Sequence, residues 1–208
     1  MKWGRCPSAR FVDEEYFKIL FFTIRAMKTE KKINIAELPI ELNRDNFCRS
    51  LIRELAGTLQ DLVGLEEASG FVSVVGQNMG QEINEAYKRA AGVEHFSREE
   101  VAEILVDLKH RIKGDFYLIK QNEDELVFGN RACPFAEKVN GRPAMCMMTS
   151  NVFGAITADH LGYARVELKE TIAEGHPGCR VVVHLKRQPQ TEGKGGREGR
   201  EYFRKIRV

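Results

Sequence analysis

The sequence predicts an α+β fold, in which N-terminal helices pack on a C-terminal antiparallel sheet. Three observations support this prediction. Apolar residues recur every three or four positions in the first half of the chain, whereas short apolar or alternating runs dominate the second half. These runs occur in two pairs, each joined by a short polar segment, which indicates hairpins. One helical segment separates the pairs, so the expected order is strand–strand–helix–strand–strand.

Composition limits the functions that fit this chain. It has 208 residues, 43% of them hydrophobic, and a formal net charge of +2. The apolar content is enough for a sizeable core. Such a balanced charge is not typical of a dedicated nucleic-acid binder, so we do not expect nucleic acid as a partner. No apolar run is long enough to span a membrane, and the first residues do not resemble a secretory signal. We therefore expect a cytoplasmic protein with reduced thiols.

The chain divides into three parts on the basis of its local composition. Residues 1–40 are expected to form a helical extension, because 12–28 would be apolar on more than one side of a helix. Residues 41–187 are expected to form the main domain. Residues 188–208 are expected to be a linker or tail, because glycine is frequent there and large apolar residues are absent up to residue 200.

Four helices are expected before the sheet, one of them in the extension. The second can begin at Asp45, whose short polar side chain is suited to cap a helix. The third contains Gly76 and Gly80, which weaken an isolated helix and therefore predict a close packing contact. The fourth begins at a capping box that starts with Ser97, and Gly114 ends it.

The second half of the chain is expected to supply four strands and one helix. Thr149 or Ser150 can cap this helix, and Gly162 can end it. The expected strands are 116–120, 125–129, 163–172 and 179–187, and the helix is 149–162.

Three of the five cysteines lie at the ends of these elements. Cys133 follows the second strand, Cys146 precedes the helix, and Cys179 opens the last strand. Once the strands pair into one sheet, the three element ends that carry these cysteines can lie close together. With Glu170 and, as a further possibility, His176, they offer the thiolate, carboxylate and imidazole ligands of zinc, or the sulfur ligands of an iron–sulfur cluster. The alternative is that the thiols are small core side chains.

Two segments resemble known families. ETIAEGHPGCRVVV (170–183) resembles the end of the vinyl-4-reductase (4VR) domain, the sensor module of aromatic-responsive transcriptional activators. That resemblance implies a zinc ion held by Cys146, Cys179 and Glu170. The family's further cysteine is replaced here by Thr171, and Cys133 could substitute for it. A longer segment, about residues 70–187, resembles the methanogen output domain, through motifs such as GRPAMCMMTSNVFG and LGYARVELKETIAEGHPGCRVVV.

These resemblances imply a non-enzymatic sensory or signalling module. The resemblance to the 4VR domain further implies a role in transcription regulation. Such a module would pass its signal to an effector or to a kinase or phosphatase domain. Its small-molecule pocket would lie between the helices and the sheet and would take a mainly apolar ligand. The expected pocket residues are Phe71, Val75, Met79, Met147 and Phe153. The simpler interpretation of this apolar stripe is ordinary core.

Two other expectations concern assembly and catalysis. The surplus of apolar residues in 12–28 favours a homodimer. A cysteine enzyme, with Cys146 as nucleophile and His160 or His176 as base, is the catalytic alternative. We disfavour it because neither an oxyanion-hole motif nor an orienting carboxylate can be placed.

Overall fold

The computed structural model describes residues 15, 18, 34–40, 42–187 and 199–204. The chain forms two compact units, Met1–Glu41 and Leu42–Val208. In the first unit, a short 3-10 turn (η1, Ile35–Glu37) is described. The predicted helix over 12–28 lies, apart from residues 15 and 18, outside the described residues. All elements discussed below belong to the second unit.

Helices of the second unit form where the apolar periodicity predicts them. Asn43 caps the first of them, because its side chain accepts a hydrogen bond from the Asn46 N–H at 2.9 Å. The predicted cap, Asp45, lies instead in the first turn. The capping box of Ser97 is present as expected. The helices are α2 (Arg44–Val63), α3 (Leu65–Ala91), α4 (Arg98–Arg111) and α5 (Met147–Leu161).

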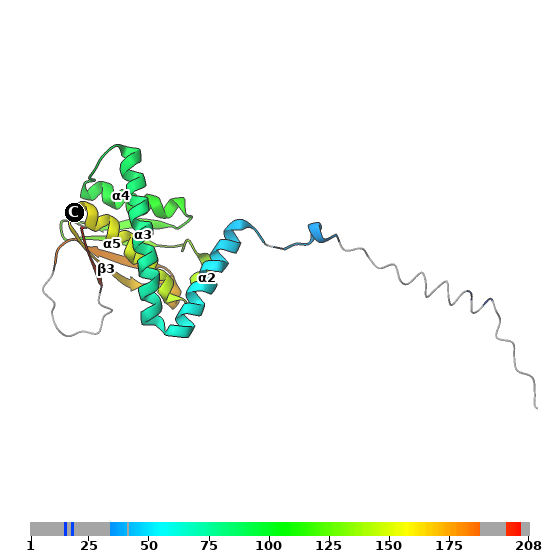
Figure 1. Ribbon diagram of the computed structural model, residues 1–208. Helices are drawn as coiled ribbons and strands as arrows, with labels where there is room; N and C mark the ends of the chain where they lie inside the picture. The colour runs from blue at the N-terminus through cyan, green and yellow to red at the C-terminus, as the bar shows by residue number, and fades with distance from the viewer. Residues whose placement is uncertain (1–14, 16–17, 19–33, 41, 188–198, 205–208) are drawn as a thin grey trace, which may run out of the picture. The chain divides into compact units, whose positions relative to one another are not determined.

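One antiparallel sheet follows the first three helices, which confirms the predicted α+β class (Figure 1). Its strands lie in the order β1-β2-β4-β3-β5, and both predicted hairpins, β1–β2 and β3–β4, are present. The strands are β1 (Phe116–Gln121), β2 (Glu125–Asn130), β3 (Tyr163–Glu170), β4 (Cys179–His184) and β5 (Arg200–Phe203).

Strand β5 lies in the segment that the sequence assigned to a linker or tail. It pairs with β3, with Tyr202 opposite Ala164. The Tyr202 side chain packs against Gly154 of α5, where a Cβ atom would meet its ring, and its hydroxyl lies 3.0 Å from the Ser150 hydroxyl. Pattern analysis misses this strand because it has four residues and follows a glycine-rich stretch.

Helix α5 is the central element of the layers. It packs against β3 and β5 on one side and against α3 on the other (Figure 1). Gly76 and Gly80 lie at the α3–α5 contact, as their spacing predicts: a Cβ at Gly76 would lie 2.9 Å from the Asn151 Cβ. The helix begins at Met147, two residues before the predicted start, and Ser150 bonds to β5 instead of capping it.

Three short 3-10 turns surround a small second core beside α2. They are η2 (Ala136–Val139), η3 (Pro143–Cys146) and η4 (Ile172–Glu174). Each turn contributes one buried side chain to this core: Val139, Met145 and Ala173. Arg53 of α2 donates a hydrogen bond to the Asn140 carbonyl at 2.9 Å, so α2 holds the loop that contains η2 and η3.

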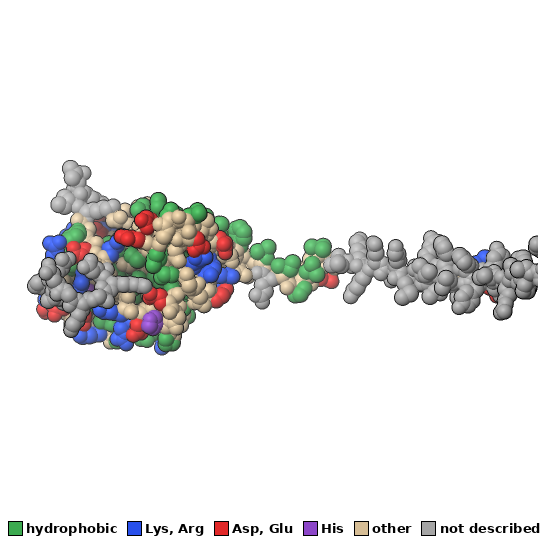
Figure 2. Space-filling view, turned by 90° about the horizontal axis from the view of Figure 1, so that it is seen from below, with side chains coloured by type: hydrophobic (Ala, Val, Ile, Leu, Met, Phe, Trp, Pro, Cys, Tyr) green, Lys and Arg blue, Asp and Glu red, His purple; other side chains and the backbone are tan. Residues whose placement is uncertain are grey.

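The surface mixes charges of both signs, and hydrophobic side chains gather along one edge of the space-filling view (Figure 2). Within the described ranges, no helix is long and apolar enough to cross a membrane.

Candidate functional site

The structure brings three of the predicted site residues together. Cys146 occupies the N-cap position of α5 without a side-chain capping bond, Cys179 begins β4, and Cys133 lies three residues beyond β2. Their thiols lie within electrostatic range of one another. Burial raises the pKa of Cys146 to about 12, and its two neighbours add to this effect. Burial also raises the pKa of Cys133. Cys133 and Cys146 therefore carry their protons near neutral pH.

A buried lysine, which sequence analysis missed, lies beside the three thiols. Lys109, in the last turn of α4, is 5% exposed, and its ammonium group donates a hydrogen bond to the Thr149 hydroxyl at 2.9 Å. Its nitrogen lies 5.3 Å from the ring centre of Phe116 and 5.4 Å from that of Phe153. Burial lowers the pKa of Lys109 to about 8, and the three thiols oppose this shift.

The other polar groups at the thiols differ from the predicted set. Thr171 is buried, and its hydroxyl forms a hydrogen bond that opposes the rise in the Cys146 pKa. The Cys179 sulfur accepts a hydrogen bond from the Ile172 N–H at 3.5 Å. Glu170 is exposed at the end of β3, opposite Arg180 in the sheet.

His176 is also exposed, in the turn before β4. Glu170 and His176, the two predicted ligands that carry no sulfur, are therefore not buried with the thiols.

The three thiols are chemically suited to bind a metal ion, but their side chains are not arranged to do so. Three thiols are the donors that zinc and iron–sulfur clusters take. Yet among the residues that the structure describes, no group of three or more His, Cys, Asp or Glu side chains is arranged to hold a metal ion. An ammonium group also lies beside the sulfurs, where a divalent cation would meet its charge.

The predicted pocket residues do not line one common space. Phe71, Val75 and Met79 on α3 are 59%, 52% and 44% exposed. Phe153 of α5 is fully buried in the main core, where its ring forms edge-to-face contacts with two other phenylalanines. Met147, in the first turn of α5, is half-buried. The apolar stripe of α3 is thus a surface feature.

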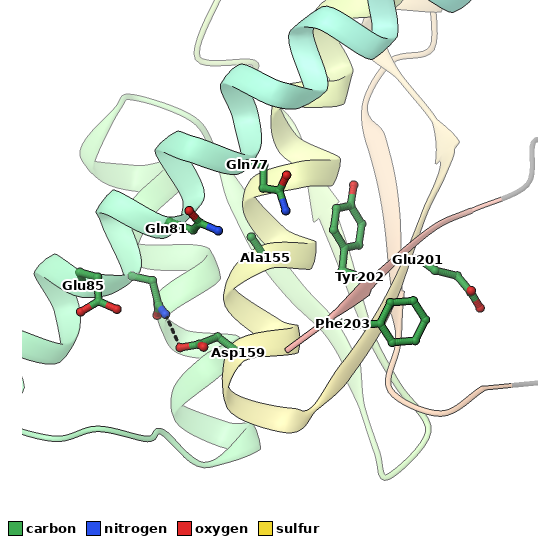
Figure 3. Close-up of a pocket in the computed structure, with 9 residues that line it drawn as sticks. Gln77, Gln81, Glu85, Ala155, Asp159, Glu201, Tyr202 and Phe203 are labelled. Atoms are coloured by element: carbon green, nitrogen blue, oxygen red, sulfur yellow. Dashed lines mark hydrogen bonds between the residues drawn. The ribbon is translucent and has the colours of Figure 1, made fainter. Parts of the chain in front are cut away.

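A cleft of about 500 Å³ lies elsewhere, between α3, α5 and β5 (Figure 3). Gln77 and Gln81 point into it from α3, and β5 contributes the Tyr202 ring, whereas Glu85 lies farther along α3 at the end of the cleft (Figure 3). Glu201 lies on the other side of the strand. Sequence analysis could not have found this cleft, because β5 forms one of its walls. The remaining lining residues are Asn84, Ala155, Asp159 and Phe203.

A polar network that includes two lining residues, Asn84 and Asp159, lies beside this cleft. The Asp159 carboxylate accepts hydrogen bonds from the Asn84 amide and the Lys88 ammonium, both at 2.8 Å. Burial tends to raise the pKa of Asp159, but the neighbouring Lys88 ammonium outweighs this effect and lowers it. His160 accepts a hydrogen bond from the Phe96 N–H at Nδ1, and its Nε2 donates one to the side-chain oxygen Oδ1 of Asn84 at 2.7 Å.

This bonding pattern requires a neutral His160 ring with its proton on Nε2. Burial lowers the pKa of His160, which is consistent with the neutral form. His160 is therefore a structural link between α5, α3 and the start of α4, and both of its ring nitrogens are occupied.

The helix-on-sheet fold described above also occurs in solved structures. The phenol-responsive sensory domain of the transcription activator PoxR matches with a TM-score of 0.53 and 16% sequence identity, over 70% of this chain and 75% of that chain. A trafficking protein particle complex subunit 3 from Naegleria fowleri, covalently bound to palmitic acid, gives 0.46 and 14%, over 69% and 98%. An H-NOX protein from K. algicida gives 0.42 and 14%, over 61% and 68%.

The model of methanogen output domain 1 matches residues 51–184. The chain belongs to this family. The match begins within α2 and ends at the last residue of β4, so it spans the thiol cluster and most of the cleft. No curated protein matches the chain.

Proposed function

We propose that this chain is a non-enzymatic sensory module that binds a small molecule and signals to an effector protein or domain. The observation that carries the proposal is the cleft of about 500 Å³ between α3, α5 and β5, a volume in the range of small-molecule sites. Membership of an output-domain family and the fold shared with the PoxR sensory domain, which responds to phenol, support it.

The lining of the cleft suggests the chemistry of the ligand. Gln77 and Gln81 offer amide groups, and Tyr202 and Ala155 offer apolar surface. Glu85 and Asp159 add carboxylates, both of which also pair with Lys88. A ligand with a small apolar part and a hydroxyl, amide or ammonium group matches this lining. The proposed ligand is therefore more polar than the mainly apolar molecule expected from the sequence.

Signalling would use the strand that forms one wall of the cleft. A ligand changes the balance between two packings only if it prefers one of them. A molecule seated between α3 and β5 touches both elements, so it can favour one position of β5 relative to α5. Effector contact, a role in transcription regulation and a cytoplasmic location, where the free thiols stay reduced, are parts of the same proposal.

Chemical-shift mapping of the full chain tests this proposal. The probes are phenol, benzamide and benzylamine, which share a ring and differ in the polar group. We expect at least one probe at millimolar concentration to shift the amide signals of residues 77–85 and of Tyr202. Gln81→Trp should fill the cleft and abolish the shifts, whereas Glu82→Trp, at the exposed neighbouring position, should keep them. If no probe gives saturable shifts at the cleft, the proposed ligand site is wrong.

We further propose, as a second candidate feature, that the thiol cluster takes up a zinc ion, with an iron–sulfur cluster as the alternative. The observation in favour is that three cysteines from distant parts of the sequence lie together. Binding would require the loss of the thiol protons and a rearrangement of the side chains. Cys133, Cys146 and Cys179 would be the ligands, and Glu170 would have to turn inward to complete the set. The signalling proposal does not depend on the metal.

Elemental analysis and an absorbance spectrum of protein purified without oxygen decide the question. We expect about one equivalent of zinc and no visible absorbance; broad visible absorbance would identify the iron–sulfur alternative. Cys146→Ser should lower the metal content and the melting temperature together. Cys48→Ser, at an exposed cysteine of α2, is the matched control. A metal content below about a tenth of an equivalent would leave the thiols as core side chains.

A further inference from the structure

Helices α2 and α3 each carry an exposed row of large apolar side chains. On α2 the row is Phe47, Leu51 and Leu55, which are 56%, 47% and 65% exposed. On α3 it is Phe71, Val75 and Met79, at 59%, 52% and 44%. We call these six side chains the α2–α3 face. Members of each row are four residues apart, so each forms a straight ridge along its helix.

Each row lies on the side of its helix that faces away from the domain. Helix α2 packs through the buried Ala56 and Gly57, and α3 packs through Gly76 and Gly80 against α5. A helix with a solvated outer side carries polar residues there. Apolar ridges on these outer sides are therefore a sign that another surface covers them.

The area of the α2–α3 face is at the upper limit for the surface of a monomer. At roughly half exposure each, the six side chains present on the order of 600 Å² of apolar area, the upper end of the largest patch on a typical monomer. Leu62 and Val74, 78% and 60% exposed on the same two helices, add to it. A standard interface covers about 800 Å² on each partner, so the area fits a protein–protein contact.

We propose that the α2–α3 face is the contact between two copies of this chain. A second copy brings the same ridges with the same four-residue spacing, which can interdigitate across a two-fold axis. The ridges carry no charge, so identical surfaces do not repel each other. Two of the ion pairs that α2 forms lie within the chain: Arg49 with Asp45 at 3.4 Å, and Asp61 with Arg142 at 2.7 Å.

This proposal stands apart from small-molecule binding, because the cleft uses the opposite side of α3. Sedimentation of the full chain tests it. We expect twice the chain mass at micromolar concentration. Leu55→Glu and Val75→Glu should each weaken the dimer at least about tenfold, because the contact would bury an unpaired carboxylate. Ile119→Glu, at a 44% exposed position on β1, is the matched control and should keep the dimer.

Circular dichroism and the melting temperature check that each variant is folded. A wild-type chain that sediments at monomer mass at about 100 µM, or a folded glutamate variant that keeps the dimer, overturns the proposal. A photo-reactive phenylalanine analogue in place of Phe47 identifies the covering surface. Cross-links between copies support the proposal, whereas cross-links within one chain to residues 1–33 overturn it.

Discussion

At the scale of single residues, Lys109 gives the thiol cluster its electrostatic character. A buried ammonium group is normally paired with a carboxylate, because burial penalises the charged form. Among the described residues, its surroundings are a hydroxyl, two aromatic rings and three cysteine side chains, with no carboxylate among them. The folded state therefore holds this positive charge at a cost that depends on pH.

This cost predicts how stability changes with pH. Because the pKa of Lys109 falls from 10.5 in the unfolded chain to about 8, the unfolded chain binds more protons between these values, and stability rises with pH. From about pH 7 to about pH 8.5 the free energy of unfolding should rise by on the order of 1 kcal/mol. The raised pKa values of the thiols lower stability only at higher pH.

Urea unfolding at the two pH values measures this rise. Lys109→Met should abolish it, whereas Lys120→Met, at an exposed lysine of β1, should retain it. A rise of equal size in the Lys109→Met variant would show that another group is responsible.

The candidate site could be predicted from the sequence only in part. The three cysteines lie at the ends of elements, and element ends can be placed from periodicity and turn residues. Lys109 was missed because a lysine in the last turn of a helix is typical of a solvated end that complements the helix dipole. Glu170 was expected at the thiols from its place at the end of a strand and from a family resemblance, but it is exposed there.

At the scale of elements, the contact between α3 and α5 depends on the absence of side chains. A Cβ at Gly76 would lie 2.9 Å from the Asn151 Cβ and 3.3 Å from the Met148 Cα. The second of these atoms belongs to the backbone and cannot rotate away. The two helices would have to separate to admit even a methyl group.

Two alanine substitutions in the same helix should therefore have opposite effects. Gly76→Ala should lower the free energy of unfolding by about 1–3 kcal/mol, because overpacking outweighs the gain in helix propensity. Gly70→Ala should raise it by about 0.5–1 kcal/mol, because a Cβ there meets nothing within 4 Å. Denaturant unfolding of both variants checks this, and a stabilising Gly76→Ala would mean that the helices are not in close contact.

The two faces of α3 show why periodicity cannot identify what covers a helix. The glycine face packs against α5, and the face with Phe71 and Val75 is exposed. Neither the glycine positions nor the Phe71 and Val75 positions carry a charge, so the sequence pattern allows either face of α3 to pack against the core. Only the position of α5 decides, and α5 is brought there by the sheet.

At the scale of the whole molecule, the fold class was predictable because it follows from the order of the elements. Helices come first, and the two hairpins then flank one helix, which limits the chain to helices on an antiparallel sheet. Strand β5 was not predictable, since its four residues carry one buried large side chain. The cleft was missed for the same reason.

The contribution of β5 to overall stability can be measured at two adjacent residues. Tyr202 is 7% exposed and packs on Gly154, whereas Phe203 is 55% exposed. Tyr202→Ala should lower the free energy of unfolding by about 3 kcal/mol, as expected for removing a buried ring. Phe203→Ala should cost under about 1 kcal/mol. Equal effects in urea unfolding would indicate that β5 does not dock on α5.

The attachment of β5 has a practical consequence for splitting the molecule. The strand is held by its pairing with β3. The next residue, Arg204, also holds it, because its side chain donates hydrogen bonds to the backbone carbonyls of Asp159 and His160, both at 2.7 Å. These bonds do not require a covalent link to β4. A chain truncated after Arg187 would leave β3 as an open edge, a template for aggregation. A synthetic peptide of the last ten residues should bind that edge in trans and restore solubility, as in a split-protein complementation assay.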